Sequence, residues 1–399
     1  MVMKEGWVIK PFGEIAEFVS GSRPQGGVGQ IKSGVLSLGG EHVGINGYVD
    51  ISTPKYVPNE YFDANPKGHI QSGDILLCKD GALSGKVAIE RGELSGKESM
   101  VNEHVFIIRT DKVDQKYLFF YLFSPVGQSL LKGIVTGAAQ GGINGKNLRS
   151  IPVVFPLAIE EQRRIVAELD LLSSVIDRKH AQLRDFNVLA QSIFYDMFGD
   201  VNCNPNGYET ITLGERCEFI KDGTHQTPEY TEDTINGFKF LSAKDVVGGE
   251  INWSKIKYIP ASLHTELYKR IAPKRNDILL CKNGTTGIAA IVDTDEVFDI
   301  YVSLALLRPK SPFCPEFLLY AINNPATKEQ FDRSLKGVGV PNLHLGEIKK
   351  TIILNPPMNK QEEFKKKIDV VCKNIETLRK SLSDTEILLE SRMGAYFND

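Results

Sequence analysis

Two long stretches of the chain carry apolar side chains at alternating steps of four and three residues. This spacing is typical of the seam of a coiled coil, and neither stretch contains an internal proline. The sequence therefore predicts two long helices, residues 159–200 and 359–399, which we expect to pair antiparallel. The predicted seam is Leu169, Leu172, Ile176, Lys179, Leu183, Phe186, Ala190, Ile193 and Met197 in the first helix and Phe364, Ile368, Val371, Ile375, Leu378, Leu382, Thr385, Leu389, Arg392 and Tyr396 in the second.

Helices of this length would extend about 60 Å at 1.5 Å per residue. Antiparallel pairing would hold two globular parts apart at the ends of a rod. The alternative is that each helix packs only on its own globular part. The narrow apolar stripe favours pairing with another helix.

The remaining residues, 1–158 and 201–358, show a different pattern. Short β-rich runs, broken by Gly, Pro and Asn, predict strands at 105–108, 151–155, 288–292 and 351–354. Apolar residues recur every three or four positions in 116–131 and 316–335, which predicts helical segments there. Each part is thus expected to be a mixed α/β (α+β) domain.

The second half of the chain repeats the first at an offset of about 200 residues. Residues 74–81 and 277–284 differ only in that Asn283 replaces Asp80. The copies close in similar ways, with Phe198-Gly199-Asp200 in one and Phe397-Asn398-Asp399 in the other. A period this long indicates a duplicated domain, so we expect two tandem, pseudo-symmetric domains.

Charge and composition narrow the function classes. The 47 basic and 50 acidic residues give a net charge of −3, which argues against a protein that grips nucleic acid by charge alone. Basic side chains would have to gather on one face, or a partner would have to supply the rest. The six cysteines form no C-x-x-C pair, so we expect no metal and no disulfide framework. No stretch of the sequence is apolar enough to span a membrane, and the N-terminus does not resemble a secretory signal. We therefore expect a cytoplasmic protein without membrane association.

Motifs for catalysis are incomplete. Asn355-Pro356-Pro357-Met358 resembles the N-P-P-aromatic motif of amino-methyltransferases, but Met358 cannot stack on a flipped base as an aromatic ring does. The Gly-rich segments at 81–86 and 92–97 fall one residue short of a phosphate loop. We therefore expect no catalytic residues and no cofactor.

Several motifs together resemble a known family. They are the opening Trp7–Ile15 with its echo Tyr208–Arg216, the duplicated Asp74–Gly81 element, and Ile151–Leu157 running into Glu161–Val166. The chain resembles the specificity subunits of Type I restriction-modification systems over nearly its whole length. The second copy departs from the pattern over residues 355–364.

This resemblance implies a non-catalytic subunit with two target-recognition domains, 1–158 and 201–358. Each would recognise one half of a split double-stranded DNA target, and the helix pair would set the spacing between halves. The implied partners are adenine methyltransferase subunits and, optionally, a translocase-nuclease subunit. Because the loops of the two copies differ, the target should be asymmetric. The alternatives are a stand-alone DNA methyltransferase or endonuclease, and a coiled-coil scaffold without a DNA role.

Candidate DNA contacts lie in three kinds of loop. Arg suits the O6 and N7 acceptors of guanine and Gln suits adenine. Lys79 and Lys282 begin turns in which Gly81 and Gly284 permit positive φ, and these lysines would point outward to a phosphate. Gly-rich stretches let the backbone approach a partner closely. Solvated loops and ordinary turns remain the alternative for each. The candidates are Arg23, Gln25, Lys79, Gln140, Asn144, Lys146, His225, Gln226, Lys282, Asn283, Asn342 and His344.

Docking of the methyltransferase partner is expected on the outer faces of the long helices. Charged side chains there could pair with a partner, although a solvated helix surface would look the same in sequence. The candidates are Glu160, Glu161, Arg163, Arg164, Lys179 and Arg184.

Overall fold

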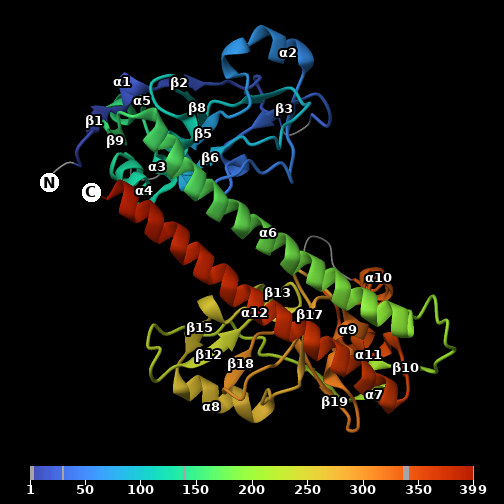
Figure 1. Cartoon of the computed structure of the whole chain (residues 1–399). Helices are drawn as coiled ribbons and strands as arrows, with labels where there is room; N and C mark the ends of the chain where they lie inside the picture. The colour runs from blue at the N-terminus through green and yellow to red at the C-terminus, as the bar shows by residue number, and fades with distance from the viewer. Residues whose placement is uncertain (1–3, 29–30, 138–140, 336–340, 399) are drawn as a thin grey trace. The chain divides into compact units, whose positions relative to one another are not determined.

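The computed structural model describes residues 4–28, 31–137, 141–335 and 341–398. The chain divides into two compact units (Figure 1): unit 1 consists of Met1–Ala181 with Arg379–Asp399, and unit 2 consists of Gln182–Leu378. Among the described helices, none has the length and apolar character that crossing a bilayer requires.

Unit 1 contains a four-stranded antiparallel sheet, a smaller three-stranded sheet and a separate pair of antiparallel strands. The four-stranded sheet has the order β2-β8-β5-β6, and the smaller sheet has the order β4-β3-β7 with β3 and β7 parallel. The strands are β1 (Trp7–Pro11), β2 (Glu17–Ser20), β3 (Val35–Leu38), β4 (Tyr56–Val57), β5 (Ile75–Cys78), β6 (Val87–Ile89), β7 (Ser99–Val101), β8 (Val105–Arg109) and β9 (Pro152–Pro156), of which β1 pairs with β9.

Unit 2 repeats this topology, which confirms the duplication expected from the sequence. Its large sheet has the order β11-β19-β16-β17 and its small sheet β15-β12-β18, again with one parallel pair. The strands are β10 (Thr210–Thr212), β11 (Cys217–Asp222), β12 (Phe238–Leu241), β13 (Val246–Val247), β14 (Glu250–Ile251), β15 (Lys257–Ile259), β16 (Ile278–Cys281), β17 (Ala289–Ile291), β18 (Phe298–Ile300), β19 (Leu304–Pro309) and β20 (Ile352–Leu354), with β10 paired to β20 and β13 to β14.

A β-bulge between Cys217 and Phe219 changes how the two copies correspond. A bulge adds one residue to one strand of a pair. As a result Ser20 lies opposite Phe106 in β8, while Asp222 takes the matching place opposite Ala305 in β19. The structural counterpart of Ser20 is therefore Asp222.

The helical segments expected at 116–131 and 316–335 are each two helices. Pro125 and Pro325 stand at the break, where a proline has no N–H to continue the preceding helix. Ser124 caps the new helix by accepting from the Gly127 N–H at 3.2 Å, and Asn324 accepts from Ala326 N–H at 2.9 Å. The helices are α3 (Gln115–Phe123), α4 (Pro125–Gly133), α9 (Pro315–Ile322) and α10 (Pro325–Arg333).

Shorter helices complete the two units. The α-helices are α1 (Phe12–Ile15), α2 (Asn59–Ala64), α5 (Gly145–Ser150), α7 (Leu213–Arg216), α8 (Ala261–Arg270) and α11 (Leu345–Lys350); the 3-10 turns are η1 (Gly40–His42), η2 (Pro66–Gly68), η3 (Gly81–Leu83), η4 (Ala243–Asp245) and η5 (Trp253–Lys255).

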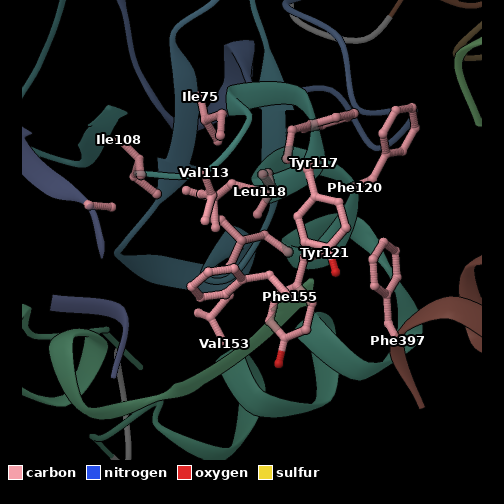
Figure 2. Close-up of a cluster of buried hydrophobic side chains, with 14 of the residues drawn as sticks. Ile75, Ile108, Val113, Tyr117, Leu118, Phe120, Tyr121, Val153, Phe155 and Phe397 are labelled. Carbon is pink, nitrogen blue, oxygen red and sulfur yellow. The ribbon is translucent and has the colours of Figure 1, made fainter. Parts of the chain in front are cut away.

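The core of unit 1 lies between its large sheet and α3 (Figure 2). Tyr117 and Tyr121 are fully buried, and each phenol donates to a carbonyl of β9, Val154 at 3.0 Å and Pro152 at 2.9 Å. Burial raises the pKa of Tyr121 to about 12. These bonds satisfy the only polar atoms of two otherwise apolar side chains, so α3 is fixed against β9.

The two long helices are α6 (Ile159–Phe198) and α12 (Met358–Phe397), each 40 residues long. In unit 1 the first part of α6 packs against the last part of α12, and in unit 2 the reverse holds, so the helices run antiparallel as predicted. The alternative of helices that pack only on their own globular parts is wrong.

Each unit is completed by the end of the helix that the other copy supplies. Phe397 lies in unit 1 with its ring edge-on to Tyr117 and Tyr121, at centroid distances of 5.5 and 5.6 Å (Figure 2). Phe198 lies in the core of unit 2, edge-on to Phe317 at 4.9 Å. The duplicated Phe at the end of each copy is therefore a core residue of the opposite unit.

The predicted seam of α12 is largely buried, whereas α6 departs from its own. On α6, Phe194 and Phe198 are buried in unit 2 although the predicted seam passes through Ile193 and Met197. Lys179 meets α12 through its ammonium, which donates to the Ser381 carbonyl and the Thr385 hydroxyl, both at 2.6 Å.

Candidate functional site

In unit 1, the predicted contact loops meet at one edge of the large sheet. β2 and β5 end at this edge and β8 begins there, because β8 is antiparallel to both. The turn after β5 is tied to its neighbours by backbone bonds from Lys79 N to His104 O and from Gly81 N to Gly141 O, both 2.9 Å. We call the resulting surface, residues 20–27, 79–84, 102–104 and 141–144, the unit 1 loop face.

Unit 2 brings the matching loops together in the same way. Lys282 N donates to Ser303 O at 2.8 Å, and Leu343 N donates to Lys282 O at 3.0 Å. Asn283 and Asn342 form a β-bridge that matches the one between Asp80 and Gly142. Residues 222–228, 282–286, 301–303 and 341–344, together with Arg270, which contacts Asp222, form the unit 2 loop face.

Two acids organise the unit 1 loop face. Arg23 Nε lies 2.5 Å from Glu103 Oε1, and the same oxygen is 3.3 Å from His104 Nε2. The other ring nitrogen of His104 lies 3.1 Å from Asp80 Oδ2. Lys79 meets neutral partners among the described residues, since its Nζ donates to Ser20 Oγ at 3.4 Å and lies 5.0 Å from the centre of the Phe106 ring.

A single acid, Asp222, organises the unit 2 loop face. Its Oδ2 accepts from Lys282 Nζ at 2.9 Å and lies 3.1 Å from His225 Nε2, while its Oδ1 accepts from Arg270 Nη2 at 3.1 Å. Burial works against the charge of this carboxyl, but the bonds from Lys282 and His225 hold its pKa below the ordinary value of 3.8.

The two turn lysines are placed differently. Gly81 and Gly284 have φ values of +80° and +75°, as expected for these turns. Lys282, however, is buried and its side chain is only 5% exposed, so the expected outward direction is wrong for this lysine. Lys79 is partly exposed.

The other predicted contacts are spread over the two faces. Gln25 lines a cavity of about 540 Å³ with Arg23 and Glu103, and Gln226 lines one of about 210 Å³ beside the start of α8. Asn144 caps α5 by accepting from Asn147 N–H at 2.7 Å.

Of the remaining candidates, Lys146 and His344 are exposed and Asn283 is partly exposed. Asn342 has a buried Oδ1 for which the described residues provide no hydrogen-bond partner. Gln140 lies outside the described residues.

Glu103, His104, Asp222 and Arg270 were not among the contacts predicted from the sequence. Asp222 is the first residue of the candidate loop 222–228, so its position was a usable signal. Arg270 gave none, because it ends a helix of 10 residues whose counterpart α2 has 6. A cation in the last turn of a helix is ordinarily explained by the helix dipole.

The candidate docking residues on α6 also differ in placement. Glu160, Arg163 and Arg184 are exposed. Arg164 forms a two-pronged contact with Glu161, with both distances 2.8 Å. The outward placement expected for Lys179 is wrong, because its ammonium bonds α12.

The described part of the chain contains no group of three or more His, Cys, Asp or Glu side chains arranged to hold a metal ion.

Comparison with known proteins places these features in context. A family model for the Type I restriction modification DNA specificity domain matches the chain twice, over residues 4–185 and 205–384. The Type I restriction enzyme MjaIX specificity subunit of Methanocaldococcus jannaschii is 23% identical over 383 residues, covering 90% of this chain and 85% of the relative.

Two solved structures have a similar fold. The S subunit of a Type-I restriction-modification system from M. genitalium matches with a TM-score of 0.51 and 14% identity, over 98% of this chain and 97% of that chain. A chain from work on complex assembly and conformational transition of the type I R-M system matches with a TM-score of 0.55 and 18% identity, over 100% of this chain and 99% of that chain.

Proposed function

The chain belongs to the family of Type I restriction modification DNA specificity proteins, and from this premise we propose that each loop face recognises one half of a split DNA target. The observation that carries the proposal is the convergence of the candidate loops at one sheet edge in both units. Loops held on a rigid sheet position side chains precisely enough to distinguish base edges.

The target is asymmetric in this proposal. The two loop faces share a backbone frame but present different side chains, Arg23 and Glu103 in one and His225 and Arg270 in the other. Hydrogen-bond donors and acceptors of different kinds select different base pairs in the major groove. The two half-sites should therefore have different sequences.

Catalysis is assigned to partner subunits. The relatives are named as specificity subunits of restriction enzymes, and this chain would direct adenine methyltransferase subunits and, where present, a translocase-nuclease subunit to the target. Glu160 and Arg163 are exposed on the part of α6 that belongs to unit 1 and form the proposed docking surface for the methyltransferase. Arg184, on the part of α6 in unit 2, is a separate exposed candidate.

The proposal is tested by mapping methylated adenines in cells that express the chain with an adenine methyltransferase partner. The expected result is a split, asymmetric motif that requires both proteins. Exchanging the unit 1 loop face for that of a relative should change one half of the motif and leave the other half intact.

Two outcomes contradict this proposal. Methylation by the purified chain alone would indicate an enzyme that acts by itself. The absence of any motif, with no sequence-selective binding to DNA, would favour a scaffold built on the paired helices.

A further inference from the structure

Each loop face carries one arginine that is half exposed and fixed by a carboxylate. In unit 1, Arg23 is held by Glu103, and its side chain is 48% exposed. In unit 2, Arg270 is held by Asp222, and its side chain is 50% exposed. Both guanidinium groups are thus oriented by the protein while part of each remains open to solvent.

These two arginines do not occupy equivalent positions in the duplicated frame. Gly21 and Gly223 correspond, because each packs closely against a carbonyl of the small sheet, that of Val101 and that of Ile300. Counting from these glycines, the counterpart of Arg23 is His225.

The counterpart of Arg270 follows from a second matched contact. Arg109 Nη2 donates to His69 O at 2.9 Å, and Arg308 Nη2 donates to Ala272 O at 2.8 Å. Counting back from these carbonyls, the counterpart of Arg270 is Lys67. The two units therefore build the same arginine–carboxylate arrangement from positions that do not correspond. If the pair only stabilised the shared fold, we would expect it at corresponding positions in both units.

Each carboxylate engages only part of its guanidinium. Arg23 uses Nε and Arg270 uses Nη2, whereas the group has five N–H donors in a planar fork. A fork held along one side presents donors in a fixed direction on the other. Such a fork matches the paired O6 and N7 acceptors of guanine.

The charge of the unit 1 arrangement favours a base over a phosphate. Glu103 offsets the charge of Arg23, so a phosphate approaching this arginine would be repelled by the adjacent carboxylate. The O6 and N7 atoms of guanine carry no net charge, so they avoid this repulsion. In unit 2, Asp222 is shared by Arg270 and the buried Lys282, so there the fixed direction of the guanidinium, rather than charge, favours a base edge.

We propose that each half-site contains one guanine recognised by a carboxylate-held arginine, Arg23 with Glu103 in unit 1 and Arg270 with Asp222 in unit 2. This inference rests on the proposed function and assigns particular residues to it. Glu103 and Asp222 are positioning residues that orient the guanidinium groups.

The test uses the full-length chain with its methyltransferase partner in cells, and compares the methylated motifs of wild type, Arg23→Lys and Arg270→Lys. Lysine keeps the positive charge but lacks the two-pronged geometry. Each variant should lose preference for guanine at one position by about 10- to 100-fold. The affected positions should lie in opposite half-sites, so each variant serves as the control for the other.

Lys269→Ala is a matched charge control, because Lys269 is exposed on the same helix as Arg270. It should weaken binding without changing the motif. In a double-mutant cycle, Asp222→Asn and Arg270→Lys should be non-additive at the same guanine position, while the other positions of that half-site keep their preference. A purely structural role for Asp222 would instead relax every position of the half-site.

Three results would overturn the inference. A wild-type half-site without a guanine would exclude guanine recognition by the arginine of that unit. A methylated motif that is unchanged in both Arg23→Lys and Arg270→Lys would exclude it for both units. A uniform loss of affinity in Arg270→Ala, equal to that of Lys269→Ala, would identify a phosphate contact instead. If the wild type yields no motif at all, the proposed function itself fails.

Discussion

The two units share a core and differ in the chemistry of their loop faces. A lysine follows the matching strand in each unit, but Lys79 meets the hydroxyl of Ser20 whereas Lys282 is buried against the carboxylate of Asp222. The bulge in β11 brings the carboxylate of Asp222 to the place that the hydroxyl of Ser20 has in unit 1. The two units therefore keep similar cores, while the side chains at the ends of their sheets differ.

The shared cores should respond equally to the loss of matching aromatic rings. Phe397→Ala in unit 1 and Phe198→Ala in unit 2 each remove a buried ring, so each should lower the free energy of unfolding of that unit by about 3–5 kcal/mol. The two tryptophans separate the signals, since Trp7 lies in unit 1 and Trp253 in unit 2. Urea unfolding is followed by Trp7 fluorescence in a Trp253→Phe background, and by Trp253 in a Trp7→Phe background. A Phe397→Ala effect seen mainly through Trp253 would contradict the assignment of this ring to unit 1.

The loop faces should respond unequally. Asp222→Ala leaves the buried ammonium of Lys282 without its carboxylate and should destabilise unit 2 by about 3 kcal/mol. Ser20→Ala removes two weak, partly exposed hydrogen bonds, one from Lys79 and one to the Glu103 carbonyl, and its effect on unit 1 should stay within about 0.5 kcal/mol. The same tryptophan reporters measure both. Equal losses in the two variants would show that the difference between the faces has no energetic consequence.

Acid should distinguish the units as well. The pKa of Asp222 is lowered in the folded chain, so the unfolded chain binds more protons at low pH and the stabilisation is lost as pH falls from the ordinary value of 3.8 through the lowered one. Over that pH range Asp222 changes the free energy of unfolding by at most about 1.4 kcal/mol per pH unit. Asp222→Asn should flatten the pH dependence of unit 2 unfolding, and Ser20→Ala should leave that of unit 1 unchanged. An unaltered slope in Asp222→Asn would mean that this carboxyl does not control acid stability.

The smallest expected difference concerns surface ion pairs in which the acidic and the basic partner have exchanged helices between the two units. Lys116 on α3 pairs with Asp170 on α6 at 2.5 Å, whereas Glu316 on α9 pairs with Lys365 on α12. Because these side chains are partly exposed, Asp170→Ala and Lys365→Ala should each cost about 0–1 kcal/mol, less at high salt. Asp170 also pairs with Arg91 at 3.1 Å, so Lys116→Ala, which leaves that second pair intact, should cost less than Asp170→Ala. A cost that does not depend on salt would indicate that packing, rather than charge, holds these helices.

The sequence by itself determined the features that depend on neighbouring residues. Periodicity predicted the two long helices, and the near identity of 74–81 and 277–284 revealed the duplication, because both signals are local in the chain. The left-handed turns at Gly81 and Gly284 followed from residue type alone. The split of the helical segments at Pro125 and Pro325 was also encoded locally, although apolar periodicity obscured it.

Only the tertiary structure decided which distant residues meet. Phe198 and Phe397 complete the units opposite to their own copies, and no periodic pattern specifies which core receives a helix end. Likewise Arg270 reaches Asp222 across 48 residues of chain, and Arg23 meets Glu103 across the loop face. These contacts depend on a bulge, on the lengths of the intervening loops and on which strands pair. All three determine where residues lie in space, but none leaves a regular spacing in the sequence.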